Sequence, residues 1–418
     1  MSFAQTPAGA PHVRCRERAW TIRGVSVLCV MLCAFAAGAE DEPRAVQDAS
    51  ESQAPESIDA QLDRRRLGPV LRQRLDKIEE ATNLRFGLAN TIVFQQATGG
   101  DGQRTTAAGD FDLLLRWTPV RAGTPNAGSL LGSAEYRYQI GAATPASLGG
   151  TIGTLVPTVD GFGERPVVLK ELYWEQRLLD DKLRFSLGRI DLGNLFGSHR
   201  LQSSNTFFLH QAFAGLPTSN NPGPGTGAAF QANLREWLVV SGGVGDANGQ
   251  ATAIRFVDFF EDGELFSFAE LALVPLERNQ NGGRYRLSFW HRDAGEESGR
   301  PSGRGVTLSC DQDVGERFVA FARYGWSDGD LTDVRHAVQV GAACQDFALK
   351  DGVLGLAASW AVPADRSLRN EKVIEAFQRF QITEFLQFTV GVQAIFDPSN
   401  APDDEAVGVF SLRLRAAL

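Results

Sequence analysis

The sequence has few cysteines, few histidines and no apolar segment long enough to cross a bilayer as a helix. It contains 5 cysteines and 5 histidines in 418 residues, and its apolar run 25–37 is shorter than the roughly 20 residues that a spanning helix needs. The motifs G-x-S-x-G, H-E-x-x-H and C-x-x-C are absent. We therefore predict no transmembrane helix, no enzyme activity, no metal site and no cofactor.

Basic residues are also fewer than acidic ones. The 41 Lys and Arg are outnumbered by 50 Asp and Glu, and the formal net charge of −9 argues against a nucleic-acid partner. Only Cys310 and Cys344 lie beyond residue 39. The strand pattern described below separates them by two strands, about 9.6 Å, whereas a disulfide needs Cα atoms within roughly 4.4–6.8 Å. Two thiols on the apolar face are expected unless the adjoining turns fold together.

The N-terminal 39 residues have the pattern of a cleaved signal peptide, which predicts export. Four arginines between positions 14 and 23 precede the apolar run, and Ala37-Gly38-Ala39 fits a small-residue cleavage site. Residues 40–57 are acidic and lack large apolar groups, which is typical of a disordered tail. Residues 58–82 have apolar positions at helical spacing, interrupted by Gly68-Pro69. This short amphipathic helix could lie at the mouth of a barrel, pair with a second copy in a homo-oligomer, or serve as a solvated linker.

From Leu84 onward the dominant period is two residues. In the run 386–396, Gln387, Thr389, Gly391 and Gln393 alternate with apolar side chains. A soluble sandwich has the same period, but long runs with arginines on one face favour a barrel with lipid outside and water within. Sixteen candidate strands lie near 84–96, 110–119, 129–141, 167–179, 183–196, 226–236, 237–247, 264–276, 283–293, 304–311, 316–326, 335–346, 352–362, 372–382, 386–397 and 407–418.

The connections between these runs alternate between short and long. Short ones are 180–182, 311–316, 345–351 and 383–385, and long ones are 142–166, 197–225, 295–303 and 327–334. Outer-membrane barrels have short turns at one end and long loops at the other. We predict an all-β protein in which residues 83–418 form a transmembrane antiparallel β-barrel of about 16 strands. Outer-membrane lipid and the barrel-assembly machinery are then expected partners, although the chain ends in Leu418 where such barrels usually end in an aromatic residue.

The segment RFSLGRIDLGNLF (184–196) resembles the G-[KR]-x-D-x-x-x-x-F segment of the carbohydrate-selective porins, the OprB-type family. The similarity continues in the same order through residues 239–249, 266–275, 305–329 and 410–418. The resemblance implies a wide outer-membrane barrel that passes glucose and related sugars by diffusion. It also suggests Arg189, Asp191, Glu270 and Arg323 as lumen positions.

Residues of the inward face are candidates for contact with sugar. A neutral polyol needs hydrogen-bond partners and aromatic faces, so charged and aromatic side chains at inward positions are the expected contacts. Such arginines could equally pair with lumen carboxylates and hold the wall. The candidates are Glu171, Tyr173, Arg189, Asp191, Phe207, Phe208, Glu270, Arg284, Arg286, Trp290, Arg323, Glu375, Arg379 and Arg413.

The polar segment 197–225 is the candidate constriction. It contains Phe207, Phe208 and Phe213 beside several Asn, Gln and His residues, and exposing so many Phe side chains to water would be costly. We therefore predict that this segment folds into the lumen, where the Phe residues either narrow the pore or only pack against the wall.

The favoured function is an outer-membrane porin for passive diffusion of small carbohydrates. Two alternatives stay open. The many inward arginines would also suit a general or anion-preferring porin. A secreted all-β carbohydrate-binding or hydrolytic protein could instead use a carboxylate pair such as Glu171 and Glu175.

Overall fold

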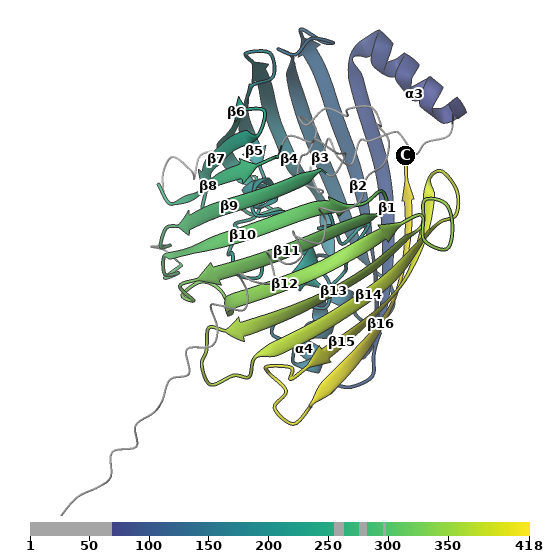
Figure 1. The fold of residues 1–418 in the computed structure, drawn as a ribbon, viewed down its shortest axis with the longest axis vertical. Helices are drawn as coiled ribbons and strands as arrows, with labels where there is room; N and C mark the ends of the chain where they lie inside the picture. The colour runs from purple at the N-terminus through teal and green to yellow at the C-terminus, as the bar shows by residue number, and fades with distance from the viewer. Residues whose placement is uncertain (1–68, 255–262, 276–281, 296–297) are drawn as a thin grey trace, which may run out of the picture. The chain divides into compact units, whose positions relative to one another are not determined.

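The described part of the chain is a closed antiparallel β-barrel of sixteen strands (Figure 1). The computed structural model describes residues 69–254, 263–275, 282–295 and 298–418. The predicted signal peptide (1–39), the acidic tail (40–57) and the first part of the predicted helix (58–68) lie outside the described residues.

All sixteen predicted strands are present, and most of their ends agree within a few residues. The strands are β1 (Leu84–Ala97), β2 (Thr105–Val120), β3 (Gly128–Gln139), β4 (Arg165–Leu178), β5 (Leu183–Ile190), β6 (Gly225–Arg235), β7 (Leu238–Asp246), β8 (Leu265–Leu273), β9 (Gly283–Arg292), β10 (Gly303–Val314), β11 (Phe318–Ser327), β12 (Val334–Gln345), β13 (Val353–Pro363), β14 (Glu371–Gln381), β15 (Leu386–Phe396) and β16 (Ala406–Ala417). The helices are α3 (Pro69–Thr82), η3 (Pro145–Ser147), α4 (Leu148–Ile152), η4 (Leu192–Leu195) and α5 (Gln211–Ala214).

Each strand pairs with its neighbours in the chain, and the first strand pairs with the last. In the β1–β16 pair, Ala89 lies opposite Ala417 and Ala97 lies opposite Val409. Closure leaves the sheet without an exposed edge, so every strand can satisfy its backbone groups by pairing. The fold class predicted from the sequence is confirmed.

The wall carries apolar side chains outward and mainly polar ones inward at the predicted positions. In β14, Glu375 is 1% exposed, whereas the adjacent Ile374 is 45% exposed. Leu308, Leu356 and Phe410 are likewise large, exposed and apolar on other strands. This alternation gives the barrel an outer surface suited to lipid.

The fifth strand is shorter than predicted. Residues 183–196 were expected to be one strand, but β5 ends at Ile190 and η4 follows, because the Asp191 side chain accepts a hydrogen bond from the Gly193 amide at 3.2 Å. Gly188 has φ of +145°, and a Cβ there would lie 2.6 Å from the carbonyl oxygen of Leu172. The glycine of the G-R-x-D segment is therefore required by close approach of β4.

Two smaller features of the fold are helix α3 and the pair of cysteines. Helix α3 begins at Pro69, where proline is tolerated because the first helical amide needs no partner, and it contacts β1. Among the described residues, no helix combines the length and apolarity that crossing a membrane would require. Cys310 in β10 and Cys344 in β12 form no disulfide, and β11 lies between their strands.

Candidate pore and the loops that enter it

The long connection between β5 and β6 folds into the barrel, and its residues 197–224 are called the inward loop below. Its residues bond to inner-wall side chains from strands on several sides of the barrel. Within it, α5 is capped by His210, whose Nδ1 accepts from the Ala212 amide at 3.2 Å. The structure thus agrees with the prediction that this segment enters the lumen.

A second connection, residues 140–164 between β3 and β4, packs against the inward loop. The Asp160 amide donates to the Leu209 carbonyl oxygen at 3.0 Å, and the Gln211 amide donates to the Pro157 carbonyl oxygen at 3.1 Å. Glu371 of β14 accepts from the amides of Leu155 and Val156 at 2.7 and 3.2 Å. The two loops therefore form one inner layer that is fixed to the wall.

One side of the inward loop packs against apolar residues of the barrel wall. Phe208 and Phe213 are fully buried, and the Phe208 ring meets the Phe377 ring edge-on with centroids 5.0 Å apart. The His199 ring stacks on Phe321 at 3.9 Å. These contacts belong to an apolar cluster with inward residues of β11 to β16 and of β1. The Phe residues of the loop therefore pack against the wall on this side, where the loop supplies apolar partners for inward Val, Ile and Phe residues.

Several predicted pore residues bind the backbone of the inward loop. Both carboxylate oxygens of Glu375 accept loop amides, from Leu209 at 2.7 Å and from His210 at 2.9 Å. Arg413 donates to the carbonyl oxygens of Ser204 and Phe207 at 2.7 and 2.8 Å. A loop without regular structure has many backbone groups to satisfy, and these buried charged side chains satisfy them.

Two further arginines of the wall bind the backbone of the inward loop in the same way. Arg323 donates to the Ala212 carbonyl and the Gln202 side chain, both at 2.9 Å. Arg379 donates to the Thr206 carbonyl at 3.1 Å and lies over the Phe207 ring at 5.3 Å.

At the start of the loop, Glu270 accepts from the Gly197 amide and Arg286 donates to the Ser198 carbonyl, each at 2.7 Å. Arg189 donates to the carbonyl oxygens of Leu169 and Gln250 at 2.9 and 2.6 Å. We call Glu270, Arg286, Arg323, Glu375, Arg379 and Arg413 the loop clamps.

The other side of the inward loop borders a polar cavity of about 480 Å³. Its opposite wall is formed by β2, β3 and β4. The lining includes eight charged residues, Asp110, Asp112, Glu135, Arg137, Asp160, Arg165, Lys170 and Asp191, together with loop residues such as Gln202, Ser204, Asn205, Gln211, Ser219 and Asn221. Carboxylates, amides and hydroxyls are groups that can replace water around a polyol.

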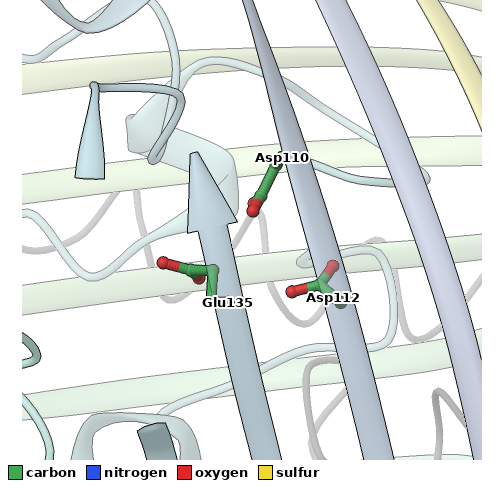
Figure 2. Close-up of side chains that lie close together, drawn as sticks. All are labelled: Asp110, Asp112 and Glu135. Atoms are coloured by element: carbon green, nitrogen blue, oxygen red, sulfur yellow. The ribbon is translucent and has the colours of Figure 1, made fainter. Parts of the chain in front are cut away.

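Three carboxylates of this wall lie close together, on the neighbouring strands β2 and β3 (Figure 2). Asp110, Asp112 and Glu135 offer oxygen atoms that all lie within 4.8 Å of one another. Arg137 balances part of this charge, with Nε 3.3 Å from Asp110 and a terminal nitrogen 2.9 Å from Glu135. Arg165 also contacts Glu135, at 2.8 Å.

Burial shifts the pKa of several groups in the connections that enter the barrel. Desolvation raises the pKa of Asp160 and of Asp191, which both line the cavity. Burial lowers the pKa of His210 to about 3, so this ring is neutral around pH 7. His199 is neutral for the same reason. Its Nδ1 accepts from the Leu201 amide at 3.2 Å, so its Nε2 carries the proton and donates to the Phe213 carbonyl at 3.0 Å.

Most of the predicted site residues fall into four groups. Asp191 lines the polar cavity, and its amide donates to Glu171 at 3.2 Å. Tyr173 and Arg284 line a separate cavity of about 120 Å³, which shares Asn194 with the polar cavity. Phe208 and Trp290 are buried in apolar clusters, and the loop clamps hold backbone.

The selection from sequence missed Asp110, Asp112, Glu135 and Arg137. Their signal was present, because in both GDFD and AEYR the charged residues occupy every second position beside an outward aromatic residue.

Comparison with known proteins identifies the family. Residues 122–291 and 279–418 match the model of the carbohydrate-selective porins, OprB family. The chain belongs to this family. Porin AaxA of Chlamydia abortus is 21% identical over 264 residues, which cover 61% of this chain and 58% of that relative. The match thus spans little more than half of the relative's length.

Solved structures of the OprB family have the same fold. The high-pH structure of Pseudomonas putida OprB has a TM-score of 0.67 at 15% identity, covering 82% of this chain and 96% of that one. The low-pH structure has a TM-score of 0.53 at 13% identity, covering 84% and 98%. Family and barrel together place this protein in the outer membrane, within a class of channels rather than enzymes.

Proposed function

We propose that this protein forms a water-filled channel through which small carbohydrates diffuse passively across the outer membrane. The observation that carries the proposal is the polar cavity inside a closed barrel, between β2–β4 and the inward loop. Its mixture of carboxylates, amides and hydroxyls offers both hydrogen-bond donors and acceptors to a polyol. Membership in the OprB family supports the same substrate class.

The alternative of an anion-preferring porin rested on the inward arginines. That basis is weakened, because Arg323, Arg379 and Arg413 are buried and bonded to carbonyl oxygens of the inward loop. An arginine held in this way offers few donors to a passing anion. We therefore favour sugar diffusion over anion preference.

We propose no catalytic role for Glu171 and Glu175. Glu171 accepts from Ser133 at 3.3 Å as well as from the Asp191 amide, and Glu175 pairs with Arg116 and Arg177 at 3.3 and 3.2 Å. Both carboxylates are therefore engaged in holding the wall. The soluble, secreted alternative is also disfavoured by the apolar outer face of the barrel.

Liposome swelling tests the proposed function. Liposomes containing the purified protein should swell faster than protein-free liposomes in isotonic glucose, and more slowly as the sugar becomes larger. Amino acids of matched size serve as the control for selectivity. Equal swelling in sugars and amino acids would indicate a general porin, and the absence of sugar-dependent swelling would refute the proposal.

A further inference from the structure

The charges that line the polar cavity do not cancel. Five carboxylates (Asp110, Asp112, Glu135, Asp160 and Asp191) face three basic side chains (Arg137, Arg165 and Lys170), a formal surplus of two negative charges. The loop clamps do not offset it within this cavity, because Arg323, Arg379 and Arg413 are absent from the described residues that line it. A narrow channel with this lining attracts cations.

The three basic groups converge on one carboxylate. Glu135 lies 2.9 Å from Arg137, 2.8 Å from Arg165 and 4.0 Å from Lys170. Asp110 shares Arg137 through Oδ2, and its Oδ1 is buried and accepts no hydrogen bond from any described residue. The cavity therefore contains a buried carboxylate oxygen available to a donor.

Asn205, on the opposite side of the cavity, provides an independent observation. Its side chain is 8% exposed, and its Oδ1 accepts no hydrogen bond within the described part of the chain. Asn205 lines the same cavity as Asp110. A buried polar oxygen without a partner is costly, so an acceptor on each side of the cavity indicates a ligand that donates hydrogen bonds.

The charge and the acceptors together select the chemistry of the ligand. An ammonium group is positive and carries three donors, so it suits both the surplus charge and the two oxygens. A divalent metal ion suits the site less well, because three cationic side chains already surround Glu135. A neutral sugar hydroxyl can donate to the oxygens but gains nothing from the charge.

We infer that the polar cavity prefers carbohydrates that carry a protonated amine, such as amino sugars, over neutral sugars. This inference rests on the proposed sugar channel and specifies its substrate class. The amine is expected to lie between Asp110 and Asn205, while the ring hydroxyls contact the remaining polar lining.

Current block by glucose, glucosamine and N-acetylglucosamine in planar bilayers tests this inference. The three sugars share a ring and differ at one position, which carries a hydroxyl, an amine that is still mostly charged at about pH 7, or a neutral amide. Half-block by glucosamine is expected at roughly two- to fivefold lower concentration than by glucose, the range of a solvated charge pair. N-acetylglucosamine should resemble glucose, and raising the salt concentration should reduce the difference.

A matched pair of variants identifies the responsible group. Asp110→Asn should remove most of the preference, whereas Asp365→Asn, at an exposed acid in the connection between β13 and β14, should retain it. Equal block by glucose and glucosamine in the unmodified protein at low salt concentration would overturn the inference and leave the sugar channel intact. If no sugar blocks or permeates, the proposed function itself fails.

Discussion

Deleting Asn205–Ala214 is expected to raise the single-channel conductance several-fold and to weaken block by glucose. The deleted segment contains Phe208, Phe213 and α5, which fill the lumen beside the polar cavity. Removing it opens the apolar side of the lumen to the polar cavity. Conductance of single channels in planar bilayers, with and without glucose, measures the effect.

A milder variant keeps the test informative if the deletion variant does not fold. Replacing Phe208 and Phe213 together by alanine keeps the loop length but removes its apolar contacts, at a cost of about 3–5 kcal/mol for each Phe in a packed core. The double variant should show unstable, larger conductance levels. Unchanged conductance in both variants would mean that the inward loop does not narrow the pore.

Replacing Glu375 by glutamine should loosen the inward loop and produce rapid current fluctuations. The carboxylate accepts two loop amides, whereas glutamine has one acceptor oxygen and a donor that would face an amide N–H. Leaving one buried amide unsatisfied costs about 1–3 kcal/mol, which raises the population of channels with a displaced loop roughly 5- to 150-fold. Noise analysis of the open-channel current measures this change.

The matched control is Glu384→Gln in the exposed turn between β14 and β15. It removes the same charge near the same strand without affecting the loop, so its current should remain as steady as that of the unmodified protein. If the two variants show the same noise, Glu375 does not fix the loop.

The barrel could be predicted from the sequence because the alternation of inward and outward side chains is a pattern between adjacent residues. A strand with lipid on one side and protein on the other alternates at every residue, as Ile374 and Glu375 do. The position of each strand and its inward set follow from this alternation, whereas the even number of strands follows from closing an antiparallel sheet. The end of β5 could not be predicted in this way, because a side-chain bond from Asp191 to Gly193 turns the chain there.

The roles of the inward residues were harder to predict, since they depend on a loop that has no period. Arg413 and Glu375 point into the barrel, and their partners are backbone groups of Ser204 and Leu209, more than 160 residues away in the chain. Nothing in either strand indicates that an aperiodic segment will supply those partners. Contact of these residues with sugar stays an untested prediction.

The acidic wall was missed for a different reason. Asp110 and Glu135 follow the same alternation as the predicted site residues, and the alternation alone does not distinguish the inward residues that line a cavity from those that bind a loop. Only the three-dimensional arrangement shows that most of those arginines bind the loop whereas the acids line the cavity.

The central claim is that solutes cross the barrel through the polar cavity and not through the packed apolar side. It can be tested with single cysteines after replacing Cys310 and Cys344 by serine. Ser204 lines the cavity, whereas Ala357 lies in the apolar cluster. A membrane-impermeant, charged thiol reagent added during bilayer recording should reduce the conductance of the Ser204→Cys channel and leave the Ala357→Cys channel unchanged. The reverse pattern, or no reaction at Ser204→Cys, would contradict this account.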